Sequence, residues 1–366
     1  MIKVLHIVNS MNIGGLENVV RSILLNSDKK EVVCDCLICG EEHSYYEKEL
    51  MNSGVIVYKL KSKSPSKLEL YKELLKFFRA HKEYTVVHAH MAFTNGIIAA
   101  AASTSGIKNI IVHSHGVKLP KEGTMVRIPY EMTMRFLMGR YSTRLIGCSE
   151  MAGKYLFGEK WFKKKGEVFL NSILVEQYKF SNEMRIKTRI QLNVENKIIL
   201  GTVGSISAAK NQIHLLKILN LIKDKEYAVL IVGDGPGKAE LLKYTEQNRI
   251  GNKLILTGKR DNVIPYLNAM DVFVFPSLSE GFGVALLEAQ ANGLPCVVSD
   301  RIQNEAKIAP NIYTVSLDAP VDEWISTIQK ALKTGRSDNM KLLKERGLDA
   351  QDSCENITAF YKRIVK

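Results

Sequence analysis

The chain has 366 residues, a length that suits two domains of roughly 170–190 residues each. Hydrophobic residues make up 46% and charged residues 24%, which is ordinary for a globular protein with well-formed cores. No apolar run approaches the roughly 18–20 residues of a membrane-spanning helix, so we expect none. The N-terminus predicts a strand and lacks a signal-peptide cleavage site, and we therefore expect a cytoplasmic protein.

The net charge is +13, and the first half of the chain is the more basic. Residues 1–170 hold 25 Lys and Arg against 16 Asp and Glu, whereas residues 171–366 hold 26 against 22. A basic domain suits nucleic acid or an anionic membrane surface. No helix-turn-helix, RNA-binding or zinc-finger motif occurs, so we expect no nucleic-acid partner and favour peripheral contact with the inner face of a membrane.

Six cysteines without a secretion signal predict free thiols. Cys34, Cys36 and Cys39 lie close together in the sequence, on a segment typical of a strand. Alternate residues of a strand face opposite ways, and no second Cys or His pair has matching spacing. The sequence therefore predicts buried strand cysteines here rather than a metal site.

Strands alternate with helices along both halves of the chain, which predicts an α/β protein with two doubly wound parallel sheets in series. In the first half the expected strands are 3–9, 32–38, 85–89, 109–113, 144–149 and a last one within 168–175, and the expected helices are 15–26, 68–81 and 96–105. In the second half the expected strands are 197–203, 227–232, 254–257, 272–275, 297–298 and 312–315, and the expected helices are 212–222, 238–248, 263–269 and 354–365.

The most informative segment follows the strand expected at 272–275 and leads into an Ala-rich helix. Its notable residues are Glu280, Gly281, Phe282, Gly283, Val284 and Glu288. The glycines permit a sharp turn and offer backbone N–H groups at the helix start. In open α/β sheets, ligands bind beyond the carboxyl ends of the strands. Two carboxylates and several N–H groups there suit a polyhydroxylated ligand, and the pattern predicts a sugar nucleotide.

This segment, together with Gly293-Leu-Pro295-Cys-Val-Val-Ser-Asp300, closely resembles the signature of the retaining glycosyltransferases of family 4, including bacterial capsular and exopolysaccharide enzymes. The resemblance covers nearly the whole chain and implies the GT-B architecture, two Rossmann-like domains facing each other across a cleft. It implies an N-terminal acceptor-binding domain at 1–172, a nucleotide-sugar-binding domain at 173–350, and a closing helix at 351–366 that packs back on the first domain.

Paired glycines, Gly14 and Gly15, follow the first expected strand and permit close backbone approach to a phosphate at a helix N-terminus. By resemblance, this loop reaches the donor diphosphate and the acceptor. Glu17 either pairs with an acceptor hydroxyl or favours the first helical turn.

His113 and His115 follow a strand end, where an imidazole can donate to a sugar hydroxyl or accept a proton. Members of the family carry a functional histidine there, near the donor sugar. Alignment by the strand favours His113, which we take as the catalytic candidate, and alignment by the following glycine favours His115. His88 and His90, one strand earlier, are expected to be structural or to lie on the acceptor side.

A third loop, at 204–212, matches the family's glycine–arginine…lysine loop, except that Ser205 stands where an arginine is usual. The leaving nucleoside diphosphate needs a cation, and Lys210 supplies one. Arg260, in the segment that frames the base in the family, is the candidate to replace the missing arginine. Gly235 is expected beside the nucleotide. Another departure is Leu174, where the family has an acid.

By the same resemblance, Glu280 binds a donor-sugar hydroxyl, Glu288 accepts the ribose hydroxyls, and the N–H groups of 282–284 lie near the donor. No Asp-x-Asp occurs, which fits transfer that depends on no metal or other cofactor. No side-chain nucleophile is evident. The resemblance implies front-face attack by the acceptor, with retention of configuration.

The segment 125–140 mixes apolar and cationic residues. It is either a membrane-surface element or a core helix with a solvated face, and Pro129 limits its continuity.

We therefore expect a retaining glycosyltransferase that moves a hexose or N-acetylhexosamine from a nucleoside-diphosphate sugar, a UDP-sugar, to a glycan or lipid-linked glycan in polysaccharide biosynthesis. Ser205 and Leu174 motivate one alternative, a catalytically silent homologue that serves as an accessory subunit of a glycan-assembly complex.

Overall fold

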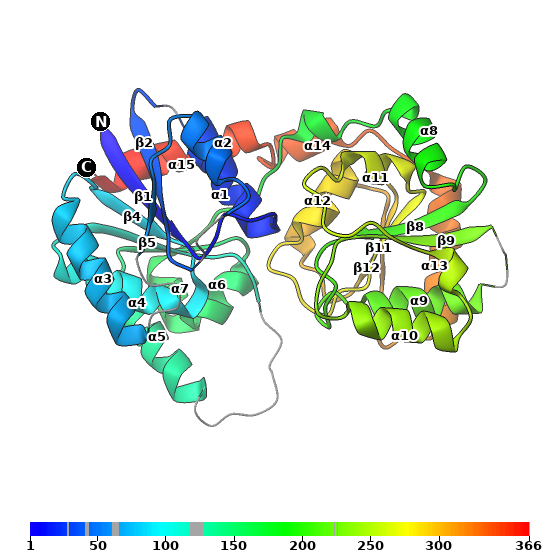
Figure 1. Cartoon of the computed structure of the whole chain (residues 1–366), viewed down its shortest axis with the longest axis horizontal. Helices are drawn as coiled ribbons and strands as arrows, with labels where there is room; N and C mark the ends of the chain where they lie inside the picture. Colours follow the sequence, from blue (N-terminus) through cyan, green and yellow to red (C-terminus); the bar gives the residue numbers. More distant parts are fainter. Residues whose placement is uncertain are drawn as a thin grey trace. The chain divides into compact units, whose positions relative to one another are not determined.

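A computed structural model describes residues 1–27, 29–40, 44–60, 66–117, 127–222, 224 and 226–365. The chain divides into two compact units. The first unit comprises Met1–Asn171 and Ala350–Lys366, and the second comprises Ser172–Asp349. Each unit is built on its own parallel sheet with helices on both faces (Figure 1). This is the doubly wound α/β class that the alternation of strands and helices predicts.

The sheet of the first unit has seven strands in the order β3-β2-β1-β4-β5-β6-β7. Every pairing is parallel, and the order reverses direction between β1 and β4, where an open α/β sheet forms its ligand crevice. The strands are β1 (Ile2–Val8), β2 (Val32–Ile38), β3 (Val57–Lys59), β4 (Val86–Ala89), β5 (Asn109–Ser114), β6 (Arg144–Gly147) and β7 (Gly166–Val168).

The helices of the first unit cover both faces of this sheet, with α3, α4 and α5 on one face and α1, α2 and α15 on the other (Figure 1). They are α1 (Gly15–Asn26), α2 (Glu47–Asn52), α3 (Lys67–Ala80), α4 (Asn95–Thr104), α5 (Arg127–Tyr141), α6 (Glu150–Phe157), α7 (Glu159–Lys165) and α15 (Ala350–Val365), with a short 3₁₀ turn, η1 (Ala92–Thr94).

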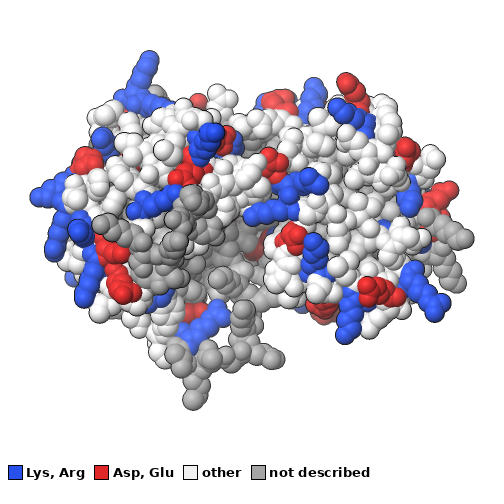
Figure 2. All heavy atoms as spheres, viewed as in Figure 1, with Lys and Arg blue, Asp and Glu red and all other residues white. Residues whose placement is uncertain are grey.

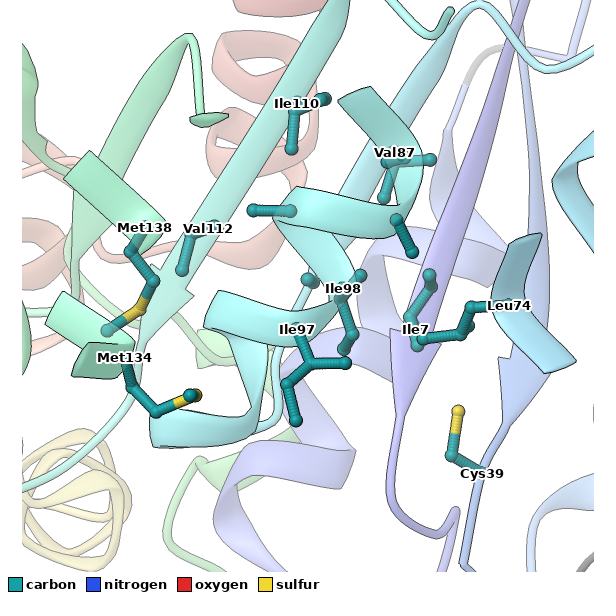
Figure 3. Close-up of a cluster of buried hydrophobic side chains, with 14 of the residues drawn as sticks. Ile7, Cys39, Leu74, Val87, Ile97, Ile98, Ile110, Val112, Met134 and Met138 are labelled. Atoms are coloured by element: carbon teal, nitrogen blue, oxygen red, sulfur yellow. The ribbon is translucent and has the colours of Figure 1, made fainter. Parts of the chain in front are cut away.

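The core of the first unit lies between the sheet and α4, which is apolar around most of its surface (Figure 3). Ile97 and Ile98 of α4 pack against strand residues such as Ile7 and Val87. Gly96 allows close contact with α5, because a Cβ there would meet the backbone oxygen of Met134 at 2.8 Å. The strand residues of opposite parity, including His6 and His88, consequently face the other side of the sheet.

The C-terminal helix α15 belongs to the first unit, where it packs on α1 and β1. Its Tyr361 is fully buried, and the Tyr361 hydroxyl lies 2.7 Å from Nδ1 of His88. The Cys354 thiol of the same helix contacts the carbonyl oxygen of Ser22 in α1. These contacts bring the two ends of the chain together in one unit.

The sheet of the second unit has six parallel strands in the order β10-β9-β8-β11-β12-β13. They are β8 (Ile198–Val203), β9 (Tyr227–Val232), β10 (Leu254–Leu256), β11 (Val272–Phe275), β12 (Cys296–Ser299) and β13 (Ile312–Val315). The helices are α8 (Asn182–Gln191), α9 (Gln212–Leu221), α10 (Lys238–Gln247), α11 (Ile264–Ala269), α12 (Val284–Ala291), α13 (Val321–Thr334) and α14 (Met340–Glu345), with 3₁₀ turns η2 (Val175–Tyr178), η3 (Gly251–Lys253) and η4 (Asn304–Ala306).

The second core is formed by the sheet with α9 and α13, and Trp324 is its largest fully buried side chain. The order of this sheet reverses between β8 and β11. The loops that follow these two strands are the ones singled out by the sequence motifs, because they carry Lys210 and Glu280.

Two expectations about elements need correction. The last strand of the first unit is β7 at Gly166–Val168, whereas we placed it within 168–175. Pro129 does not interrupt α5, because it lies in the first turn, where a helix needs no N–H from that residue. Residues 125 and 126 of this basic segment lie outside the described residues.

No helix among the described residues is long and apolar enough to cross a bilayer. All six cysteines are free and buried, as expected.

Candidate functional site

In the second unit, the two glutamates of the sequence motif flank the turn from β11 into α12. Glu280 lies in the loop and Glu288 lies in the helix, and both side chains are buried. Gly283 caps the helix with φ of 89°, a left-handed conformation that glycine adopts without strain. The sharp turn at Gly283 lets both carboxylates lie close to the carboxyl end of the sheet.

Lys210 reaches this loop from the segment after β8 and forms an ion pair with Glu280. Its Nζ lies 2.6 Å from both carboxylate oxygens of Glu280. The ammonium also lies 5.1 Å from the centre of the Phe275 ring, within cation–π range. The Lys210 side chain is 23% exposed and that of Glu280 is 7% exposed, so solvent reaches the pair from the lysine side.

The two loops that carry this pair are fixed to each other by backbone and amide hydrogen bonds. The backbone N–H of Leu278 donates to the carbonyl oxygen of Ala209 at 2.8 Å, and Nδ2 of Asn211 donates to that of Pro276 at 3.1 Å. Nε2 of Gln303 donates to the carbonyl oxygen of Glu280 at 2.6 Å. The ion pair is therefore held by a rigid frame rather than by its own charges alone.

Glu288 accepts a hydrogen bond from the hydroxyl of Tyr178 at 2.9 Å. Burial raises the pKa of Glu288 to about 7, and the Tyr178 hydrogen bond and the charge of Lys210 only partly oppose this effect. Near neutral pH, Glu288 thus exists both as a carboxylate and as a carboxylic acid. In either form it can hydrogen-bond to a hydroxyl group.

Glycines allow the loops after β8 and β9 to touch. Gly233 has φ of 152°, and a Cβ there would lie 2.0 Å from the carbonyl oxygen of Gly204. A Cβ on Gly235 would lie 2.4 Å from the carbonyl oxygen of Ile206 and 2.8 Å from Oγ of Ser205. Gly235 and Ser205 are therefore neighbours at one edge of the sheet. Ser205 is exposed, and its carbonyl oxygen accepts from Nε2 of Gln212 at 2.9 Å.

Arg260 is exposed, and its guanidinium lies 5.8 Å from the centre of the Tyr266 ring. This contact does not connect it to Lys210 or Ser205. Gly281 and Phe282 are buried, and Val284 begins α12. The backbone of 282–284 therefore lies at the N-terminal end of the helix that carries Glu288.

In the first unit, Gly14 and Gly15 lie where β1 turns into α1, as expected. Gly14 is the N-cap of α1 and Glu17 lies in the first helical turn. A Cβ on Gly14 would lie 2.3 Å from Oε2 of Glu17, so the Glu17 side chain folds back over the glycine turn.

Five histidines gather on one face of the first sheet, and we call them the histidine cluster. They are His6, His88, His90, His113 and His115. His6 of β1 pairs in register with His88 of β4. His113 lies within β5 and its ring is stacked on that of His115, with centroids 3.9 Å apart.

A chain of hydrogen bonds connects most of the cluster. Nδ1 of His90 lies 2.8 Å from Nε2 of His115, and Nε2 of His90 lies 3.0 Å from Nδ1 of His6. The hydroxyl of Tyr361 lies 3.3 Å from Nε2 of His6 and 2.7 Å from Nδ1 of His88. Both ring nitrogens of His113 are buried and have no hydrogen-bond partner among the described residues.

Burial lowers the pKa of His6 and of His115 to about 3. The pKa values of His88, His90 and His113 also lie well below the usual range, first because of burial and then because of the neighbouring imidazoles. The cluster is therefore neutral at physiological pH, when its nitrogens can serve as hydrogen-bond donors, acceptors or metal ligands.

The structure thus brings Lys210, Glu280 and Glu288 together in one unit and His113 and His115 together in the other. Three residues of these sites were not found from the sequence motifs: Tyr178, Tyr361 and His6. Tyr178 follows the start of the second unit with no diagnostic spacing. Tyr361 and His6 are 355 positions apart and meet only through the packing of α15.

Residues 184–347 match the protein family described as "Glycosyl transferases group 1". The matched region lies within the second unit and contains Lys210, Glu280 and Glu288.

Similar proteins were also found at the level of the whole chain. EpsF of Bacillus subtilis (strain 168), named as a glycosyltransferase, is 28% identical over 360 residues, which cover 96% of this chain and 94% of EpsF. The capsular polysaccharide biosynthesis glycosyltransferase CapH of Staphylococcus aureus is 27% identical, with 91% of each chain covered. The UDP-Gal:alpha-D-GlcNAc-diphosphoundecaprenol alpha-1,3-galactosyltransferase of Escherichia coli is 30% identical over 64% of this chain and 61% of its own length.

Among solved structures, HepE (Alr3699) of Anabaena in complex with UDP-glucose is similar in fold. The TM-score is 0.75 at 18% sequence identity, with 100% of this chain and 97% of HepE covered. The two Rossmann-like units and this similarity show the GT-B fold. The chain thus has the GT-B fold and contains, at residues 184–347, a glycosyltransferase domain of group 1.

Proposed function

We propose that the protein transfers a hexose or N-acetylhexosamine from a UDP-sugar to a glycan or lipid-linked glycan in polysaccharide biosynthesis, with retention of configuration. The observation that carries the proposal is the ion pair of Lys210 and Glu280 beside the buried Glu288. These groups offer one cation for a diphosphate and two hydrogen-bonding carboxyl groups for sugar hydroxyls, which matches the parts of a nucleotide sugar.

Lys210 is the group that would stabilise the diphosphate leaving group. Its ammonium is paired with Glu280 and partly exposed, so an incoming phosphate can share it without desolvating a new cation. The backbone N–H groups at the start of α12 add further positive potential. Together they would replace a divalent cation at the diphosphate, and we expect transfer that does not depend on added Mg²⁺ or Mn²⁺.

Ser205 leaves one position of this site without the bidentate donor that an arginine would supply. Arg260 is exposed and its guanidinium has the freedom of a surface side chain. We propose that it approaches the nucleotide when donor binds.

Glu280 would accept a hydroxyl of the transferred sugar, and Glu288 would hold the ribose hydroxyls. The frame formed by Asn211 and Gln303 keeps the loop of Glu280 fixed, so little ordering is needed on binding. We also propose that His113 donates a hydrogen bond to a sugar hydroxyl. We propose front-face attack, in which the acceptor hydroxyl gives its proton to a phosphate oxygen of the donor.

The names of two similar proteins support the choice of donor and acceptor. HepE was crystallised with UDP-glucose, and the Escherichia coli enzyme is named for UDP-galactose and a diphosphoundecaprenol-linked acceptor. A lipid-linked acceptor would place the enzyme at a membrane surface.

Helix α5 is the element that we propose contacts this membrane. Ile128, Met132 and Phe136 recur every four residues on it and are 64%, 62% and 57% exposed. Arg127 and Arg140 lie at its two ends, where they can reach anionic headgroups. On the face shown in Figure 2, Lys and Arg side chains are scattered among acidic ones. The exposed apolar residues of α5, rather than a continuous basic patch, therefore identify the element that contacts the membrane.

Co-sedimentation with phosphatidylglycerol vesicles tests this contact. It should fall in the double variant Ile128→Ser and Phe136→Ser, and binding equal to wild type would contradict the proposal.

The proposed function is tested first with a panel of nucleoside-diphosphate sugars in a thermal-shift assay. The cognate donor should raise the melting temperature in proportion to its affinity, and UDP alone should raise it less. In Glu280→Ala, the shift from the UDP-sugar should fall to that from UDP. Glu246→Ala, at an exposed glutamate of the same unit, is the matched control and should behave like wild type.

Transfer to an acceptor then decides between an enzyme and an accessory subunit. Product with the donor's anomeric configuration, formed without added metal, would support the proposal. A folded protein that shows no shift with any sugar nucleotide and no transfer would overturn it.

A further inference from the structure

The histidine cluster of the first unit contains more nitrogen ligands than a contact with one sugar hydroxyl would use. Five of the eight histidines of the chain meet there. Three of them, His90, His113 and His115, form a set that we call the outer triad. Each offers one ring nitrogen, and these three atoms lie within 4.8 Å of one another.

We propose that the outer triad binds a divalent transition-metal ion of the zinc type. In a tetrahedral zinc site the metal–nitrogen distance of about 2.0–2.1 Å places ligand nitrogens about 3.3 Å apart. Nδ1 of His90 and Nε2 of His115 already face each other at 2.8 Å. Binding the ion requires this pair to open and the stacked rings of His113 and His115 to turn until their lone pairs converge. The proton between His90 and His115 then moves to another ring nitrogen, and all three imidazoles stay neutral.

The buried ring nitrogens of His113 also indicate that a ligand is missing from this site. Its side chain is 3% exposed, and neither ring nitrogen has a hydrogen-bond partner among the described residues. A buried imidazole nitrogen without a partner is uncommon and calls for a missing ligand. Nδ1 of His115 also lacks a hydrogen-bond partner, so it can hold that ring's proton when Nε2 binds the metal.

The neighbouring set of His6, His88 and His90 is a weaker candidate. Five of its six ring nitrogens are engaged by the Tyr361 hydroxyl, by the bond between His6 and His90, or by His115, and only Nε2 of His88 has no hydrogen-bond partner among the described residues. Binding a metal there would break several hydrogen bonds, whereas the outer triad gives up one. His115 is also only partly buried, which offers a route of entry to the outer triad.

The inner histidines instead support the outer triad. If His90 donates from Nε2 to His6, then His6 donates to Tyr361, and the Tyr361 hydroxyl donates to His88. Every ring in this chain keeps one proton, and Nδ1 of His90 is left with its lone pair toward the metal. Such outer hydrogen bonds orient histidine ligands and raise metal affinity.

The donor atoms also select the metal. Imidazole nitrogens favour zinc, copper, iron and nickel, whereas Mg²⁺ and Ca²⁺ require oxygen ligands. Three neutral imidazoles leave a fourth position open, which is the pattern of sites that bind a water or a substrate oxygen. The proposal does not depend on the identity of the sugar donor.

The test uses the full, untagged chain after removal of metal by a chelator. Co²⁺ is added as a spectroscopic probe, and Zn²⁺ is then titrated by calorimetry. We expect one ion per chain, a visible ligand-field band of tetrahedral nitrogen-bound Co²⁺, and a rise in melting temperature without nucleotide. His115→Gln and His113→Leu should each weaken binding by about 100-fold or more. His81→Gln, at a histidine of the same unit outside the cluster, should bind like wild type.

If His113→Leu fails to fold, the His115→Gln variant decides the test. His115 is less buried than His113, so its substitution should disturb the fold less. The proposal is overturned if the folded wild type binds no metal. It is also overturned if His115→Gln binds as tightly as wild type, or if a near-ultraviolet band shows cobalt bound to a cysteine thiolate.

Discussion

Both sheets present polar side chains at the carboxyl ends of their strands, but the first unit gathers neutral groups and the second gathers charges. The histidine cluster is buried, and its pKa values are lowered because burial opposes protonation. Lys210 and Glu280 lie together as an ion pair, with the lysine partly exposed. Lys210 and Glu280 can both stay charged because each has an opposite charge at hydrogen-bond distance and solvent nearby. The buried imidazoles have no such partner and would repel one another if protonated, so they stay neutral.

Because the first site is neutral and the second is charged, the two sites suit different ligands. Neutral imidazoles can contact hydroxyls or bind a transition-metal ion of the zinc type without competing anions. An ion pair with an accessible ammonium can bind a phosphate in addition to its carboxylate. The predictions below test whether the charges of the second unit and the neutral packing of the first are each required, from the largest expected effect to the smallest.

Lys210→Ala should cause the largest loss of activity. Removal of the one cation of the ion pair should lower kcat by about 10²–10³-fold, equivalent to about 3–4 kcal/mol of transition-state stabilisation. The measurement is steady-state transfer with the cognate UDP-sugar. Lys243→Ala, at an exposed lysine of α10, is the control and should leave kcat unchanged. A Lys210→Ala enzyme with wild-type kcat would show that the leaving group is stabilised elsewhere.

Gly233→Ala should destabilise the loops of the second unit by about 3 kcal/mol. The residue has φ of 152°, and the new Cβ would lie 2.0 Å from a backbone oxygen that cannot move freely. The corresponding change in the first unit is Gly116→Ala, next to the histidine cluster, where a Cβ would meet nothing within 4 Å. Urea unfolding of the two variants checks the contrast, and equal losses of stability would refute it.

Glu288→Gln should reveal the cost of a buried carboxylate through its dependence on pH. The pKa of Glu288 is raised to about 7 in the folded state from 4.5. The folded protein therefore binds the proton more tightly, and this stabilisation is complete below about pH 4.5 and is lost as pH rises through 7. The Gln variant cannot titrate, so its stability relative to wild type should improve by up to about 3 kcal/mol between pH 4.5 and 8.

Unfolding free energies in urea at these two pH values, measured for both proteins, give this difference directly. A relative stability that stays constant with pH would mean that the pKa of Glu288 is the same in the folded and unfolded states. Glu246→Gln, at an exposed glutamate of the same unit, serves as the control.

Tyr361→Phe should have the smallest effect, a loss of about 1–2 kcal/mol. The change removes a hydroxyl that contacts both His6 and His88 and leaves two buried nitrogens unsatisfied, with no change of charge. Thermal unfolding is the measurement, and amide exchange in α15 should become faster. No change in either would show that water takes the place of the hydroxyl.

Local patterns predicted most of the regular elements well. The bounds of β2 at Val32–Ile38 and of β11 at Val272–Phe275 are those expected, because buried parallel strands are short apolar runs with clear ends. The last strand of the first unit was misplaced, because β7 has only three residues and no buried side chain. Helix α13 was missed despite its amphipathic pattern and the buried Trp324.

The candidate site divides in the same way. The motif around Glu280 and the loop of Lys210 could be recognised from sequence, because glycines and charged residues at strand ends are local features. The ion pair between them joins residues 70 positions apart and follows only from the order of β8 and β11 in the sheet. Tyr178 could not be found in advance, since its role depends on where η2 packs against α12.

The sequence by itself determined the fold class, the two Rossmann-like units and the loops that carry the charged residues. Hydrophobic periodicity and turn-forming residues depend only on neighbouring positions in the chain, so they can be recognised without the structure. Only the tertiary structure decided which side chains meet. Parallel strands that are far apart in the chain lie about 4.8 Å apart in a sheet, and this spacing converts five scattered histidines into one cluster. The packing of α15 then buries Tyr361 against that cluster and holds its inner rings neutral and hydrogen-bonded.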